Sequence, residues 1–130
     1  MAMFDQGDST LILKAELNAT NYTAPTTVKT RLGTSAPTAT SDMSELSGTG
    51  YTAGGTAMTF NTASAAATSN ASTATWTNSS GGNWSIVGIE IWNTAATVRH
   101  LWGTWTGQPV VIANTNAFAI AAAGIAVSLA

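Results

Sequence analysis

Three ionisable side chains lie close together in the second half of the sequence: Glu90, Arg99 and His100. A carboxylate that orients an imidazole serves general acid–base catalysis, because the imidazole exchanges a proton near neutral pH. That chemistry also needs a nucleophile or a second acid. No G-x-S-x-G, H-E-x-x-H, Walker A or paired-carboxylate pattern accompanies the three residues. We therefore expect a structural polar pair inside or beside a sheet, since buried charges are normally paired, and no enzymatic activity.

Tryptophan is the other residue type that could make a site. Exposed indole rings could stack on sugar rings, as they do in carbohydrate-binding modules, but aromatic residues more often fill a core or a subunit interface. Because alternate residues of a strand share a face, Trp84 and Trp92 are expected on one face, with Trp102 joining them from the neighbouring strand. The interface candidates are Phe4, Trp84, Trp92, Trp102 and Trp105.

Charge is scarce along the chain. Only 8% of the residues are charged and the formal net charge is -2. Binding of nucleic acid needs several Lys or Arg on one face, and the chain has only Lys14, Lys29, Arg31 and Arg99. It has no cysteine, which excludes disulfides and thiolate chemistry, and a single His cannot build a metal site alone. We expect no cofactor, no metal and no nucleic acid partner, and a surface suited to packing against protein.

The beginning of the chain has two predicted parts. Residues 1–8 lack the basic and apolar regions of a secretory signal peptide. They are too short and too mixed in composition to form a core element, so they are expected to form an N-terminal arm. Phe4 would anchor this arm, either on a neighbouring subunit or beneath the helix of its own chain. Apolar residues at helical spacing, behind an N-cap at Asp8 or Ser9, predict a short helix at residues 9–17.

Residues 117–130 are almost entirely apolar, but they are too few to cross a bilayer, which takes about 20 residues. Gly124 also interrupts them, so two short strands and no membrane insertion are expected. Turn residues separate further short segments rich in β-branched and aromatic residues. Strands are predicted at Thr26–Leu32, Ala57–Phe60, Ala71–Trp76, Trp84–Trp92, Thr97–Trp105, Asn116–Ala121 and Ile125–Leu129.

The number and spacing of these strands predict an all-β fold. We expect one domain over residues 1–130, an antiparallel β-sandwich or jelly-roll-like barrel with the short N-terminal helix. The segment Trp84–Trp92 is apolar on both faces, which is typical of a central strand covered by the helix or by another subunit. A hairpin closed at 93–97 would place Glu90 opposite His100 or Leu101.

Turn glycines and apolar strands spread over nearly the whole chain also carry a family resemblance. They are Asn21–Val28, Arg31–Pro37, Glu45–Tyr51, Met58–Phe60, Trp84–Trp92, Leu101–Gly103 and Ala122–Leu129. Read in this order, they resemble a family of small bacteriophage virion proteins labelled tail-fibre-like or head-decoration proteins. The resemblance implies a structural protein without catalytic residues.

The role that this resemblance implies first is decoration of the capsid exterior, where many copies cement neighbouring shell subunits. The alternative is a minor tail or tail-fibre component that helps to contact the host. A carbohydrate-binding module and a bacterial surface adhesin remain as further alternatives. The expected partners are copies of the chain itself and the major capsid protein or tail proteins. A homotrimer is favoured over a dimer, because capsid lattices and fibres both offer threefold positions.

Overall fold

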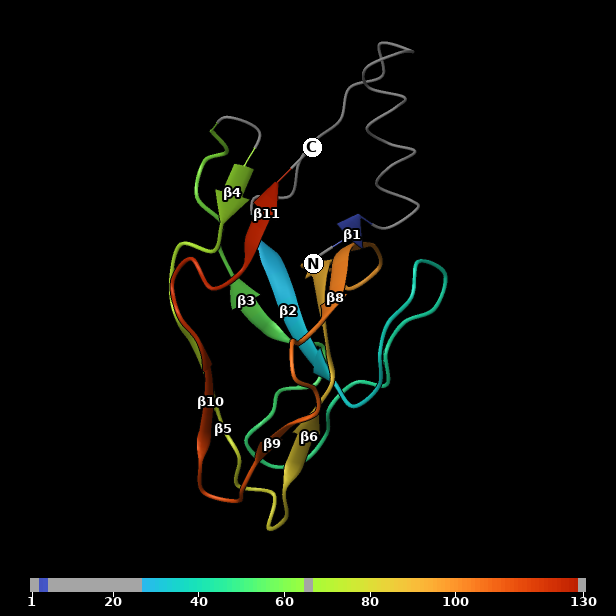
Figure 1. Ribbon diagram of the computed structural model, residues 1–130, viewed down its shortest axis with the longest axis vertical. Coiled ribbons are helices and arrows are strands. Elements are labelled where there is room, and N and C mark those ends of the chain that lie inside the picture. The colour runs from blue at the N-terminus through green and yellow to red at the C-terminus, as the bar shows by residue number, and fades with distance from the viewer. Residues whose placement is uncertain (1–2, 5–26, 65–66, 129–130) are drawn as a thin grey trace.

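The computed structural model describes residues 3–4, 27–64 and 67–128, and these residues form antiparallel β-strands (Figure 1). The predicted all-β, antiparallel class is therefore confirmed. None of the described residues forms a helix that is long and apolar enough to cross a membrane. The helix predicted at residues 9–17 lies outside the described residues. The strands are β1 (Met3–Phe4), β2 (Val28–Gly33), β3 (Thr56–Met58), β4 (Ala67–Ser69), β5 (Ala74–Thr77), β6 (Trp84–Ile86), β7 (Gly88–Asn93), β8 (Arg99–Thr104), β9 (Val110–Ile112), β10 (Ala117–Ile120) and β11 (Ala126–Ser128).

The largest sheet is five-stranded, in the order β1-β8-β7-β2-β3, and each neighbouring pair is antiparallel. Strand β7 lies at its centre between β2 and β8, as the apolar character of this segment predicted. Strand β1 adds to the edge at β8, where Met3 pairs with Trp102 and Phe4 with Leu101. The backbone of these two residues thus pairs with the protein's own sheet, and docking of the arm on a neighbouring subunit stays a prediction.

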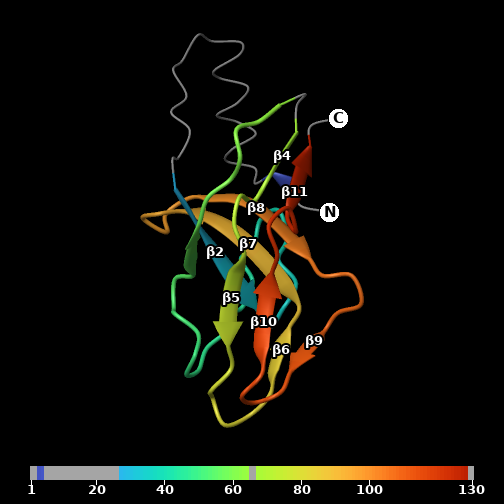
Figure 2. The same cartoon turned by 90° about the vertical axis from the view of Figure 1, so that its left-hand side faces the viewer.

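A second layer lies against one face of this sheet (Figure 2). It is a long antiparallel ribbon in which β5 pairs with β10 and β4 pairs with β11. A short ladder of β6 and β9 closes the lower end of the molecule as Figure 1 shows it. Two stacked antiparallel layers are the arrangement of a β-sandwich. The extension of one domain over residues 1–130 stays a prediction.

Two buried asparagines hold the ribbon at its irregular points. Asn70 is 0% exposed and lies where β4 gives way to β5, next to the turn between β10 and β11. Its side chain donates to the carbonyls of Ser72 and Ala121 and accepts the N–H of Ile125. Asn78, also 0% exposed, lies at the other end of the ribbon, where its side chain donates to the carbonyls of Gly82 and Ile112 and accepts the N–H of Ser80. Each side chain satisfies backbone groups that the ladder leaves unpaired.

The core lies between the two layers. Every second residue of the strands turns inward, so the apolar members of each alternating pattern meet there. Leu32 and Ile86 are the most deeply buried, at 0% exposure. The remaining members of this core cluster are Leu46, Met58, Ala74, Trp76, Trp84, Ile91, Leu101, Ile120 and Ile125.

The predicted single strand Trp84–Trp92 is wrong, because the chain changes partner in its middle. Strand β6 pairs with β9, whereas β7 pairs with β2 and β8. At the break, Val87 donates its N–H to the carbonyl of Gly33 and accepts the N–H of Trp105. The break shifts the alternation by one residue, so that Ile86 and Ile91 both reach the core. A switch of this kind leaves a continuous run of apolar residues in the sequence, which reads as one strand.

Three strands lie where none was predicted. Strand β1 lies within residues 1–8, which were expected to form an N-terminal arm. Strand β4, Ala-Thr-Ser, has too little apolar content to stand out from the polar loops around it. Strand β9, Val-Val-Ile, follows directly on Gly107-Gln108-Pro109, which was read as part of a turn. The other predicted strands occur, shifted at their ends by a few residues.

Candidate functional site

The titratable residues of the second half lie on the face of the five-stranded sheet that is turned away from the ribbon. The predicted register is wrong: Glu90 of β7 pairs with Trp102 of β8, not with His100 or Leu101. A bulge is the reason, because Ile91 pairs with Leu101 while Trp92 pairs with Arg99. His100 is thus the extra residue of the bulge. This geometry brings Arg99, rather than His100, to the carboxylate of Glu90.

The carboxylate of Glu90 is fully enclosed. Its residue is 1% exposed, and the Arg99 guanidinium donates from Nη1 to Oε1 at 2.9 Å. The backbone N–H of Met43 also donates to Oε1 at 2.9 Å, and the indole Nε1 of Trp92 donates to Oε2 at 2.9 Å. Both oxygens therefore have donors, which is what a charge needs in order to stay buried.

Arg99 connects this carboxylate to the 34–45 loop, which follows β2. The residue is 5% exposed, and its guanidinium donates to the carbonyls of Thr38 and Ser41 at 2.7 and 2.9 Å. The exposed carboxylate of Asp42 lies 3.2 Å from Nη1. An arginine fork thus binds backbone carbonyls of the loop on one side and a sheet carboxylate on the other. The loop is positioned by the sheet, not only by its own turn.

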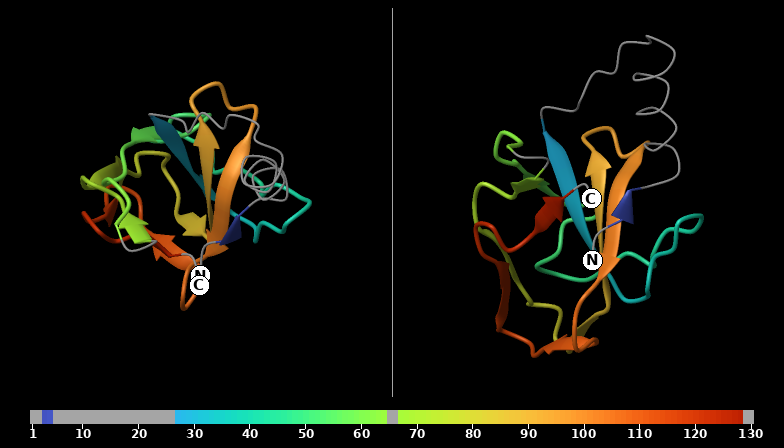
Figure 3. Two further views of the ribbon diagram at one scale, coloured as in Figure 1. Left: turned by 90° about the horizontal axis from the view of Figure 1, so that it is seen from above. Right: turned by 45° about the horizontal axis from the view of Figure 1, so that its top comes forward.

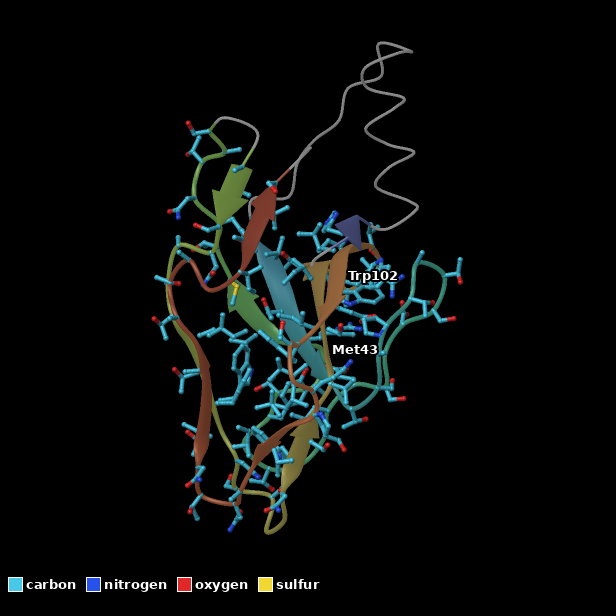
Figure 4. All side chains as sticks on the ribbon, in the orientation of Figure 1. Met43 and Trp102 are labelled. Carbon is cyan, nitrogen blue, oxygen red and sulfur yellow. The ribbon has the colours of Figure 1, made fainter. Side chains whose placement is uncertain are left out.

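The same loop lies directly on two glycines of the sheet. A Cβ atom on Gly88 would lie 2.6 Å from Cδ of Pro37 and 2.8 Å from the carbonyl oxygen of Ser35. A Cβ on Gly33 would collide with the side chain of Met43. The loop projects to the side opposite the ribbon (Figure 3), and the side chains of Met43 and Trp102 lie between it and β8 (Figure 4). Its tip, residues 38–42, is exposed.

Replacing Gly88 by Ala should loosen this loop. The added methyl group forces Pro37 and the Ser35 carbonyl outward, and overpacking of this kind costs about 1–3 kcal/mol of unfolding free energy. Chemical denaturation measures the loss, and Gly82→Ala is the matched control, because a Cβ there meets nothing within 4 Å. Equal stability of the two variants would show that the loop does not rest on Gly88.

The tryptophans are divided between the two faces of the sheet, which corrects the prediction that Trp84 and Trp92 share one. Trp84 is 2% exposed in the core, edge-on to Tyr51 with ring centroids 6.4 Å apart. Trp92 lies on the Glu90 face, where the guanidinium of Arg31 is 4.3 Å from its ring centroid. The shift of alternation between β6 and β7 separates the two indoles.

Two of the other interface candidates, Trp102 and Trp105, are partly exposed to solvent. Trp102 is half-buried opposite Glu90, and Trp105 is half-buried and edge-on to Phe118, with ring centroids 5.5 Å apart. The side chain of Phe4 lies outside the described residues. A role at a subunit interface stays a prediction for these residues. Sequence reasoning missed the stacking of Arg31 on Trp92, although strand alternation places Arg31 on the same face of β2 as Lys29.

A second carboxylate organises the far end of the same loop. Glu45 accepts the phenol of Tyr51 at 2.8 Å and the N–H of Gly54 at 2.7 Å, both on Oε1. Tyr51 in turn accepts the N–H of Leu32 at 3.2 Å. Burial raises the pKa of the Tyr51 phenol above its ordinary value, the Leu32 N–H opposes that rise, and the Glu45 carboxylate adds to it.

The raised pKa of Tyr51 predicts a loss of stability in alkali. The folded protein holds the phenol neutral, whereas the unfolded chain releases its proton from about pH 10, so unfolding is favoured as the pH rises beyond that point. In Tyr51→Phe, the unfolding free energy measured from pH 8 to 11 should fall less steeply than in the wild type. Parallel slopes for the variant and the wild type would contradict the assignment.

The cluster of Glu90 and Arg99 has a structural role. Both carboxylate oxygens of Glu90 accept hydrogen bonds, and the guanidinium of Arg99 donates to backbone carbonyls of the 34–45 loop. Within the described residues, no group of three or more His, Cys, Asp or Glu side chains could hold a metal ion. What the cluster does is fix an exposed loop on the sheet.

Comparison with known protein families supports the expectation that the chain is a bacteriophage virion protein. A family model described as podophage GP4 fiber I protein gp80 matches residues 8–128. The match covers both layers of the fold and the 34–45 loop. No curated protein matches the chain.

Proposed function

The chain belongs to the podophage GP4 fiber I protein gp80 family, a family of bacteriophage virion proteins, and we propose that it is a structural subunit of a fibre on the phage tail. The observation that carries the proposal is the match over residues 8–128, almost the whole chain. The proposed role is mechanical and non-enzymatic. The enclosed Glu90 carboxylate supports it, because a general base must be able to reach a substrate.

The surface chemistry also supports a subunit that packs against protein. After Leu46 the only fully charged residues are Glu90 and Arg99, and both are buried, at 1% and 5% exposure. The described residues beyond 46 therefore expose no fully charged side chain. The centres of protein interfaces are depleted of charge in the same way. We propose that the partners are further copies of this chain, as a homotrimer, together with other tail proteins.

Decoration of the capsid exterior, the role that the sequence favoured, is the competing proposal. The two roles differ in place and in copy number, because a cement protein needs about as many copies as the major capsid protein. The fibre role is preferred here because the matching family is described as a fibre protein. Both roles place the protein in the virion.

Electron microscopy of phage particles labelled with gold-conjugated antibody against this chain tests the proposal. The expected result is label at the tail and a copy number, measured by quantitative mass spectrometry, far below that of the major capsid protein. Label spread over the head at near-capsid copy number would replace the fibre role with decoration. Particles without label and without the chain would refute both.

The non-enzymatic part has its own test. Purified protein incubated with host surface polysaccharide and with peptides should release no product. His100→Gln is expected to leave assembly intact or to lower the thermal stability, because Arg99 is the residue that binds Glu90. Hydrolysis that is lost in His100→Gln while the fold survives would overturn this part.

A further inference from the structure

One apolar side chain stands out on the surface of the lower end of the molecule. Val111 of β9 is 57% exposed, and among the described residues no other large hydrophobic residue is exposed. Its neighbours Val110 and Ile112 pack against the core, so alternation along the strand turns Val111 outward. A single exposed apolar residue needs no explanation. Val111 becomes a candidate contact residue because the protein surface also has an apolar pocket that could receive it.

That pocket lies between the five-stranded sheet and the turn that joins β10 to β11. It holds about 150 Å³ and is lined mainly by apolar groups, with Ile89, Trp105 and Ile125 as its large members. Thr104 and three small residues, Gly103, Gly124 and Ala126, line the rest, and the small residues keep it open. An apolar cavity of this volume is large enough for a benzene molecule, so it accommodates the smaller isopropyl group of a valine.

The surface around both features favours a close approach of two copies. Glu90 and Arg99, the fully charged residues after Leu46, are buried, so the described residues after Leu46 bring no exposed, fully charged side chain to a contact. Burying an unpaired charge at an interface is costly, and Glu90 and Arg99 do not add to that cost.

We propose that Val111 of one copy enters the pocket of a second copy. The proposal rests on the fibre role and names the contact through which the copies assemble. Such a contact can be made twice across a twofold axis, or once at each interface of a closed ring. We favour the ring, as a trimer, because a fibre offers threefold positions. Each subunit of the ring then gives one Val111 and receives one.

The first test is the oligomeric state of the full-length protein by sedimentation. Val111→Asn should weaken assembly about tenfold or more, the scale of one buried valine lost from each interface. Ala126→Leu, which fills the pocket from the β11 side, should weaken it similarly. Thr40→Asn, at the exposed loop tip, is the control and should assemble like the wild type. Circular dichroism and melting curves check that every variant folds.

The second test uses the absence of cysteine from the chain. The variant Val111→Cys, Ala126→Cys should form covalent species up to trimers under mild oxidation. A mixture of the two single variants should give covalent dimers and nothing larger, because each chain then has one thiol. The pair Thr40→Cys, Ala126→Cys should give no such ladder. Covalent trimers from the first pair, together with the weakened assembly above, establish the contact.

The outcomes separate this inference from the proposed function. An oligomer that neither Val111→Asn nor Ala126→Leu weakens, and that the cysteine pair does not cross-link, overturns the Val111 contact and leaves the fibre role intact. A wild-type protein that stays monomeric at all concentrations, yet labels phage tails, likewise overturns the contact alone. Label that is missing from the tail removes the proposed function on separate grounds.

Discussion

Glu90→Gln, with Arg99 left in place, should lower the free energy of unfolding by about 3–5 kcal/mol. The amide keeps the shape of the carboxylate but not its charge, so the guanidinium of Arg99, 5% exposed, loses the group that compensates it. The amide also has one acceptor oxygen for donors that now bond to two, the Met43 N–H and the Trp92 indole among them. Urea or guanidinium denaturation measures the loss.

Two further variants test whether the loss of stability in Glu90→Gln comes from the uncompensated buried charge of Arg99. In Glu90→Leu, Arg99→Leu both charges are gone, and the loss should be smaller than in Glu90→Gln, because the Met43 N–H and the Trp92 indole are left unpaired but no buried charge is. Asp42→Asn removes the exposed partner of Arg99 and should cost less than about 1 kcal/mol. A double variant as unstable as Glu90→Gln would contradict this account.

The double variant also separates stability from loop position. Without Arg99, the carbonyls of Thr38 and Ser41 lose their donor but still face water at the exposed loop tip. Amide hydrogen exchange in residues 38–43 should therefore accelerate in the double variant even where the global stability is kept. Unchanged exchange in this segment would mean that the ion pair does not position the loop.

Asn70→Ala should cause the second large loss, about 3 kcal/mol or more. The substitution removes two donors and one acceptor, and it leaves the Ile125 N–H and the Ser72 and Ala121 carbonyls without their partner. A buried backbone group without a partner costs about 1–3 kcal/mol. Equilibrium denaturation measures the change, with melting temperature as a second readout.

Asn83→Ala is the matched control for Asn70→Ala, because Asn83 is exposed in the turn before β6. Its stability should stay within about 0.5 kcal/mol of the wild type. Asn70→Asp keeps the acceptor for the Ile125 N–H but turns a carboxylate toward two carbonyl oxygens, so it should be at least as unstable as Asn70→Ala. Near-wild-type stability of both Asn70 variants would show that the ribbon does not depend on this side chain.

The amino-acid sequence by itself determined the all-β class, the approximate positions of most strands and the virion family. These properties are local: alternation of apolar and polar residues, β-branched content and turn glycines are read within a few neighbouring residues. The central place of the β7 segment was also predicted, from apolar residues on both faces of Trp84–Trp92, although these residues belong to two strands. The pairing of Glu90 with a basic group was expected from the rule that buried charges are paired.

Only the tertiary structure decided which residues meet. One bulge in β8 replaced His100 by Arg99 as the partner of Glu90, and one break at Val87 placed Trp84 and Trp92 on opposite faces. The roles of Asn70 and the 34–45 loop depend on partners far away in the chain. The physical reason is the period of two residues in a strand: a shift of one residue costs the local pattern little, but it moves every later side chain to the other face.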